Sequence, residues 1–96
     1  MLRNQQKRYL RTLAHSKKAV VMIGNKGLTE AVLNEADRAL TDHELIKIKI
    51  NAADRQALAS MIQQLCETLD TELVQRIGHT ATLFRHNPDK RLIQLP

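Results

Sequence analysis

The stretch from residue 19 to residue 50, AVVMIGNKGLTEAVLNEADRALTDHELIKIKI, carries the pattern that decides the fold. Its first five residues form an apolar, β-branched run that ends at Gly24, which is typical of a buried strand. A helix is expected from about Thr29 to Leu40, with Thr29 as its N-cap. From Ile46 onward isoleucine alternates with lysine, so a second strand should turn its isoleucines to the core. Such strand–helix–strand units normally join parallel strands.

The elements expected outside this stretch complete one small α/β domain. They are a helix over residues 4–15, a helix capped by Asp54 with an apolar stripe reaching Leu69, and strands over Glu72–Ile77 and Thr80–Arg85. Gly78-His79 between the last two strands allows a tight hairpin. We expect the order α-β-α-β-α-β-β and a small mixed four-stranded sheet packed with helices. The chain is long enough for one core only, so residues 1–96 should form a single domain.

Composition argues against several classes of protein. The single cysteine, Cys66, cannot form an intramolecular disulfide, and the four histidines show no metal-ligand spacing. No nucleophile–base pair or carboxylate pair is apparent, so we expect no enzyme activity, cofactor, metal or small-molecule substrate. The N-terminus lacks the apolar segment of a signal peptide, and no apolar run approaches the ~20 residues needed to cross a membrane. We therefore expect a soluble, cytoplasmic protein without a membrane partner.

Positive charge is concentrated in the first quarter of the chain. The whole sequence has 15 lysine and arginine residues against 10 acidic ones, a formal net charge of +5. Residues 1–27 contain no acidic residue and seven basic ones: Arg3, Lys7, Arg8, Arg11, Lys17, Lys18 and Lys26. The remainder holds eight basic and ten acidic residues, a net charge of −2. This asymmetry favours a polyanionic partner, although a merely solvated basic surface would look the same.

The Gly24-Asn25-Lys26-Gly27 turn is the main candidate for binding a phosphate. Glycine lets a ligand approach the backbone closely, and the following helix offers free N–H groups at its positive end. The turn lacks the longer glycine-rich pattern of mononucleotide sites, so a clamp on a polynucleotide backbone fits better. We expect the basic N-terminal helix and Lys17-Lys18 to join the turn at one end of the sheet. Alone, such a turn is more often only a connection.

The chain resembles the CRM domain (chloroplast RNA splicing and ribosome maturation), and especially its stand-alone bacterial YhbY-type form. The matching segments are Leu10–Ala14, Val20–Leu28 (VVMIGNKGL), Thr29–Glu30, Glu44–Ile50 (ELIKIKI), Ile77-Gly78, Leu83-Phe84-Arg85 and Leu95-Pro96. The resemblance implies a fold similar to the C-terminal domain of bacterial translation initiation factor 3, with a KH-like G-x-x-G loop at Gly24, Asn25, Lys26 and Gly27. It also implies RNA binding, association with precursors of the large ribosomal subunit, and no catalysis.

Three positions depart from the family pattern. Phe84 stands where the family usually has tyrosine, so a hydroxyl contact is absent there. His79 replaces a basic residue found in many members, which weakens any contact expected from the hairpin. Many members have a glycine near position 70 that ends the third helix, whereas this chain has Asp70, and aspartate tolerates the left-handed backbone better than most residues.

These observations together predict an RNA-binding protein that assists assembly of the large ribosomal subunit by binding its ribosomal RNA. The residues expected to contact RNA are Gly24, Asn25, Lys26, Gly27, Thr29, Arg3, Lys7, Arg11, Lys17, Lys18 and Arg85. Arg85 would serve equally well as a residue flanking a strand end. Lys47 and Lys49 would extend the RNA footprint only if their face of the sheet is open. The alternatives are a module that docks on a ribosomal protein, and a general DNA-binding protein.

Overall fold

The computed structural model describes residues 1–96, and its elements follow the predicted order. They are α1 (Asn4–Ala14), β1 (Ala19–Ile23), α2 (Glu30–His43), β2 (Leu45–Ile50), α3 (Arg55–Leu69), β3 (Glu72–Ile77) and β4 (Thr80–Phe84). Each strand boundary agrees with the prediction to within one residue. The helix α2 ends three residues later than predicted, since it continues past Leu40 to His43 before the chain turns at Glu44.

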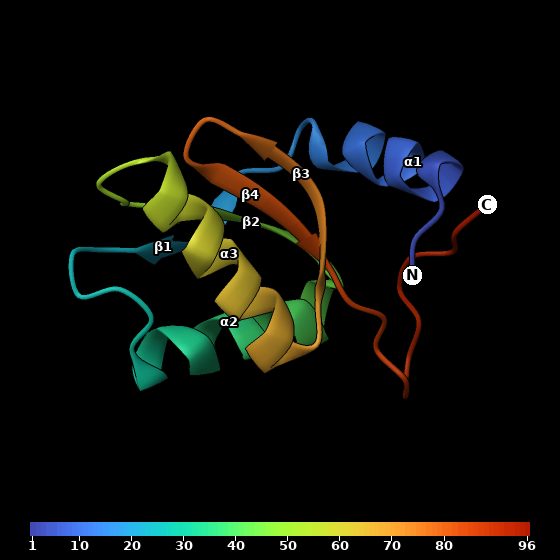
Figure 1. Ribbon diagram of the computed structural model, residues 1–96. Helices are drawn as coiled ribbons and strands as arrows, with labels where there is room; N and C mark the ends of the chain where they lie inside the picture. Colours follow the sequence, from blue (N-terminus) through green and yellow to red (C-terminus); the bar gives the residue numbers. More distant parts are fainter.

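The four strands form one mixed sheet in the order β1-β2-β4-β3 (Figure 1). The strands β1 and β2 are parallel, as the α2 crossover between them requires. The pairs β2–β4 and β3–β4 are antiparallel. Gly78 turns the β3–β4 hairpin with a φ of 57°, a backbone conformation that glycine adopts without steric cost.

One face of the sheet packs against α2 and α3, which lie together on that side (Figure 1). Ile46, Ile48 and Ile50 turn to this side and are at most 2% exposed, which confirms the alternation predicted for β2. Their partners in the core come from both helices and the neighbouring strands: Val21, Ile23, Ala36, Leu40, Leu58, Ile62, Leu65, Leu69, Ala81 and Leu83. Burial of this cluster is the main source of stability for the fold.

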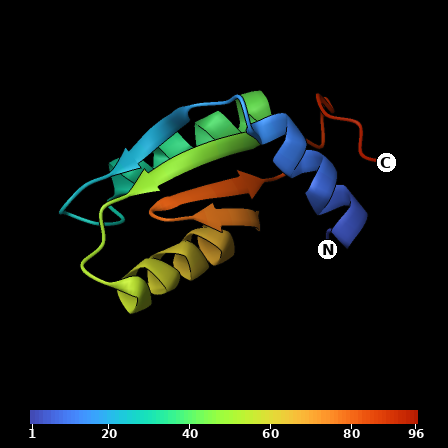
Figure 2. The same ribbon diagram turned by 90° about the horizontal axis from the view of Figure 1, so that it is seen from above.

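The helix α1 covers only one end of the opposite face. Leu10 and Ala14 of α1 pack with Leu45, Val74 and Phe84, which are the first residue of β2, the third of β3 and the last of β4. Phe84 is 4% exposed and belongs to this packed cluster. Beyond α1 the face is uncovered, as Figure 2 shows from above. We call this uncovered area the open face; its residues are Val20, Met22, Lys47, Lys49, Ile77 and Thr80.

Side-chain caps hold the N-termini of α2 and α3 as predicted. The Thr29 hydroxyl accepts a hydrogen bond from the Val32 N–H at 3.2 Å, and the Asp54 carboxylate accepts one from the Ala57 N–H at 2.8 Å. Asp70 ends α3 in the left-handed conformation, with a φ of 51° and a ψ of 50°. These caps satisfy backbone donors that the first turn of each helix leaves free.

The buried carboxylate of Glu44 anchors the C-terminal tail to the body of the domain. Its Oε1 accepts the N–H groups of Leu92 and Ile93 at 2.8 and 2.7 Å, and its Oε2 accepts the Asn87 N–H at 2.6 Å. The His86 ring lies 3.3 Å from the same Oε2. Burial alone would raise the pKa of this carboxyl, but the N–H groups of the tail and the His86 ring together hold the pKa below its ordinary value of 4.5. The C-terminal tail, to which the sequence analysis assigned no structure, is thus held against the domain by hydrogen bonds to Glu44.

Candidate nucleic-acid interface

The Gly24–Gly27 loop forms a closed turn between β1 and α2. The Gly27 N–H donates to the Gly24 carbonyl at 3.0 Å, and the Thr29 N–H donates to the Gly27 carbonyl at 3.0 Å. Gly27 has a φ of 74°, a left-handed conformation that favours glycine, so the turn itself explains the glycine at this position. Gly24 differs: its φ is not positive, and a Cβ added there would meet no atom within 4 Å. Nothing inside the protein therefore requires glycine at position 24.

Neighbouring segments hold this loop in place. The Asn51 N–H donates to the Ile23 carbonyl at 2.8 Å, and the Asn51 side-chain amide donates to the Asn25 Oδ1. The Ile50 N–H donates to the His79 carbonyl at 2.8 Å, which brings the β3–β4 turn to the same end of the sheet. Sequence analysis missed Asn51. The available signal was its position directly after β2, because the carboxyl ends of parallel strands meet at one edge of a sheet.

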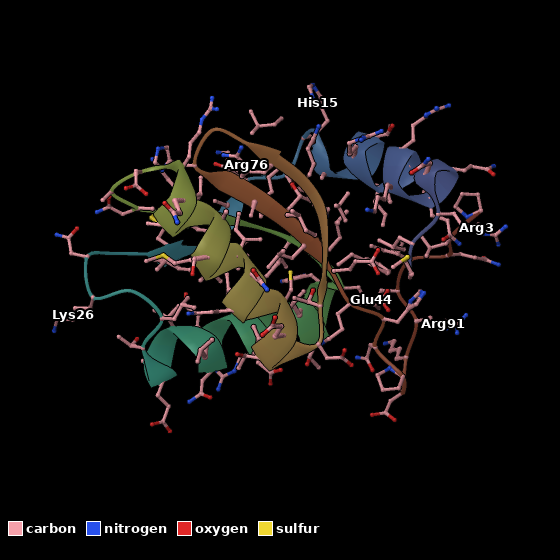
Figure 3. All side chains as sticks on the ribbon, in the orientation of Figure 1. Arg3, His15, Lys26, Glu44, Arg76 and Arg91 are labelled. Atoms are coloured by element: carbon pink, nitrogen blue, oxygen red, sulfur yellow. The ribbon has the colours of Figure 1, made fainter.

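Lys26 stands exposed at the tip of the loop, and its side chain makes no hydrogen bond or ion pair within the chain (Figure 3). Behind it, the first turn of α2 leaves the Glu30 and Ala31 N–H groups without a backbone acceptor, as at every helix start. Thr29 uses its hydroxyl to cap the helix, so its role at this site is to shape the helix start. A free ammonium beside free amide donors makes this end of the molecule suitable for binding an anion.

The basic N-terminal helix lies at the other end of the molecule, contrary to our expectation. Figure 3 shows Arg3 and Lys26 at opposite ends of the long dimension, which measures 36 Å. The reason is the direction of β1: Lys17-Lys18 precede this strand and the loop follows it. Five extended residues, about 16 Å of chain, separate them. The prediction that all three basic groups gather at one end is therefore wrong, and the structure has two basic regions.

The open face connects these two regions without an acidic residue among its members. Lys49 is exposed near its middle, and the Lys47 ammonium donates to the Lys17 carbonyl at 3.0 Å, close to the start of β1. Because α2 and α3 cover only the other face, Lys47 and Lys49 lie on an open face of the sheet, as an extended RNA footprint would require. Most acidic residues belong to the helical side, including Glu30, Glu35, Asp37, Asp42, Asp54 and Glu67. The two faces of the sheet thus differ in charge.

Arg85 makes four hydrogen bonds within the protein through its guanidinium. Its guanidinium donates to the Asp37 carboxylate at 2.8 Å, the Leu69 carbonyl at 2.8 Å, the Asp37 carbonyl at 3.0 Å and the Thr41 hydroxyl at 3.0 Å. It therefore ties the last turn of α3 to α2. Of the two roles that the sequence left open for Arg85, the structure supports the one at the end of a strand: directly after β4, its guanidinium joins acceptors on α2 to the end of α3.

Replacing Arg85 by methionine is expected to lower the free energy of unfolding by about 2 kcal/mol, because charged hydrogen bonds and helix-end acceptors lose their partner. RNA affinity of the folded protein should stay unchanged. Urea unfolding followed by circular dichroism measures the first quantity, and filter binding measures the second. An affinity loss without a loss of stability would restore the RNA contact to Arg85.

Other residues with reactive side chains do not form a second site. Cys66 is half-buried against the core, and burial raises the pKa of its thiol. No three His, Cys, Asp or Glu side chains are grouped closely enough to hold a metal ion. None of the helices combines the length and the apolar character needed to cross a membrane.

Comparison with known proteins places this geometry in a family. The CRS1 / YhbY (CRM) domain matches residues 2–85. A Haemophilus influenzae protein named "RNA-binding protein" is 43% identical over 95 residues, covering 99% of this chain and 95% of that protein. A Pseudomonas aeruginosa protein named "Probable RNA-binding protein" is 41% identical over 87 residues, covering 91% of this chain and 84% of the other.

A solved structure agrees with the fold over the full length. The solution structure of a candidate RNA-binding protein from Staphylococcus aureus superposes with a TM-score of 0.85 at 34% identity, and the match covers 100% of both chains. The α-β-α-β-α-β-β order, the four-stranded mixed sheet and the family match all point the same way. The chain therefore belongs to the CRS1 / YhbY (CRM) domain family.

Proposed function

We propose that this protein is a cytoplasmic, non-catalytic factor that binds ribosomal RNA in precursors of the large ribosomal subunit and assists their assembly. The observation that carries the proposal is the exposed Gly24–Gly27 loop, with an unpaired Lys26, at one end of an open face without acidic residues. The names of the relatives support RNA as the ligand. The ribosomal assignment rests on the resemblance to the family.

In this mechanism phosphates are bound by backbone and ammonium groups. The loop and the first turn of α2 seat one or two phosphates, and Lys26 neutralises charge beside them. Lys47 and Lys49 continue the contact across the open face. The second basic region lies at the far end and consists of Arg3, Lys7, Arg11, Lys17 and Lys18. An RNA that engages both ends must extend across the 36 Å length of the molecule, so its folded shape supplies the selectivity.

RNA affinity is expected to fall steeply with salt. If about four to six phosphates are neutralised, log affinity against log salt concentration should have a slope of roughly −3 to −5. Filter binding or fluorescence anisotropy across a salt series measures this slope. A slope near zero would show that phosphate contacts are not the basis of binding.

Sedimentation of a cell lysate through a sucrose gradient tests the assembly role. Wild-type protein should peak with large-subunit precursors, and Lys26→Glu should shift to the top of the gradient. Retention of both proteins on the particles would favour a module that docks on a ribosomal protein. Absence of both from the particles would contradict the ribosomal assignment, and comparing duplex DNA with structured RNA would then test the DNA-binding alternative.

A further inference from the structure

We propose that a hollow on the open face beside the loop binds one unpaired nucleobase of the RNA whose phosphates the loop holds. The hollow measures about 490 Å³, and its lining residues are Met22, Ile23, Gly24, Lys49, Ile50, Asn51 and His79. This inference rests on the proposed RNA binding and adds a contact to the base, where that proposal has contacts to phosphate only. The occupant is a base from a single-stranded segment, because bases in a duplex are stacked away from such a site.

The lining combines an apolar floor with positive charge. Met22 is 67% exposed although its side chain is apolar. Ile23 and Ile50 border the hollow, but their side chains belong to the core and are at most 2% exposed, so Met22 supplies the exposed apolar side chain here. Lys49 belongs to the lining, Lys26 lies on the adjoining loop, and no carboxylate lines the hollow. An apolar surface edged by ammonium groups complements a flat base attached to an anionic backbone. An uncharged apolar peptide would gain nothing from the two lysines.

Gly24 supplies an independent reason to place a ligand here. Its backbone does not need glycine, and a Cβ would meet nothing inside the protein. Because Gly24 has no side chain, its backbone borders the hollow directly at the point where the loop begins. A bound nucleotide would use that space, since its phosphate lies on the loop and its base lies beyond Gly24.

Two polar side chains of the hollow, His79 and Asn51, are oriented by contacts with neighbouring residues. The His79 Nδ1 lies 3.1 Å from the Ile50 carbonyl, which only accepts hydrogen bonds, so Nδ1 carries the proton. In the neutral ring Nε2 is then an acceptor. The Asn51 amide donates one hydrogen to Asn25 and retains its carbonyl oxygen as an acceptor. These two acceptors suit the donor groups on a base edge, and the imidazole ring adds a flat surface for stacking.

Two RNA probes of equal length and equal phosphate number test the inference: a single-stranded oligonucleotide and the same backbone without bases. Wild-type protein should bind the base-containing probe about tenfold more tightly, the effect expected from one stacked base. Met22→Ala and His79→Ala should reduce this ratio toward one while leaving the salt slope of the abasic probe unchanged. Leu92→Ala, which shortens an exposed apolar side chain of the tail, should keep the ratio.

The outcomes separate this inference from the proposed function. If wild-type protein binds both probes equally, or if the two variants keep the wild-type ratio, the nucleobase site is wrong and phosphate binding stands. If neither probe binds and structured RNA fails as well, the proposed function itself is wrong. Urea unfolding of Met22→Ala and His79→Ala shows that both variants are folded when the two probes are compared.

Discussion

Replacement of Glu44 by glutamine is expected to lower the free energy of unfolding by about 2–4 kcal/mol at neutral pH. The carboxylate is fully buried and accepts three backbone N–H groups of the tail, with the His86 ring beside it. Glutamine keeps the shape but turns one acceptor oxygen into a donor that faces other donors. Glu44 also has a φ of 63°, a backbone conformation that is costly for any residue other than glycine. The hydrogen bonds of its carboxylate help to hold this conformation.

The effect of this substitution should depend on pH. Because the folded-state pKa of Glu44 is lowered, its contribution is present above the ordinary value of 4.5 and is lost as pH falls through the lower folded-state value. A protonated Glu44 resembles glutamine, so the difference in stability between wild type and Glu44→Gln should shrink toward zero in acid. Urea unfolding at pH 7 and at successively lower pH measures this difference.

Hydrogen exchange distinguishes local from global effects of the same change. The Leu92 and Ile93 amides should lose protection in Glu44→Gln, because their acceptor is gone, while amides of β2 should lose protection only by the change in global stability. Unchanged protection of these two amides, with unchanged stability at pH 7, would contradict the anchoring role of Glu44.

Reversal of charge at Lys26 is expected to weaken RNA binding by about 10- to 100-fold at ~0.1 M salt. Loss of one phosphate contact removes about one unit of salt slope, and the new carboxylate repels the neighbouring phosphates. Folding should be unaffected, because the Lys26 side chain is exposed and makes no contact that the fold uses. Fluorescence anisotropy with a structured RNA, over a salt series, measures both the affinity and the slope.

Arg38→Glu is the matched control for this charge reversal. Arg38 is also exposed, but it belongs to α2 on the helical side of the sheet. The same change in net charge at this position should reduce affinity by less than threefold, because only distant, screened charge is altered. Equal losses in Lys26→Glu and Arg38→Glu would indicate binding by net charge alone and would contradict a localised interface.

The sequence predicted what depends on local pattern. The alternation in Leu45–Ile50 set the buried face of β2, and Thr29 and Asp54 were recognised as N-caps because capping acts over a few positions. Strand boundaries followed from glycine and from the ends of apolar runs. The loop at Gly24–Gly27 was found for the same reason.

Contacts between distant segments were not predictable in this way. The Glu44 anchor joins residues 43 to 49 positions apart, and the Arg85 network reaches 48 positions back to Asp37. Neither has a periodic signal, because one buried polar side chain leaves no pattern in the sequence. The position of α1 was missed because a helix ahead of a strand can pack at either end of the sheet, and the apolar residues around Leu45 decide between them.

Mapping the RNA contact by nuclear magnetic resonance tests the central claim most directly. Isotope-labelled protein is titrated with a structured RNA fragment, and shifts of the amide resonances are followed along the chain. The account predicts the largest shifts at the Gly24–Gly27 loop, at Lys49 and Asn51, and on α1, with the outer surfaces of α2 and α3 unaffected. Shifts that gather on α2 and α3 while the loop stays unchanged would contradict it.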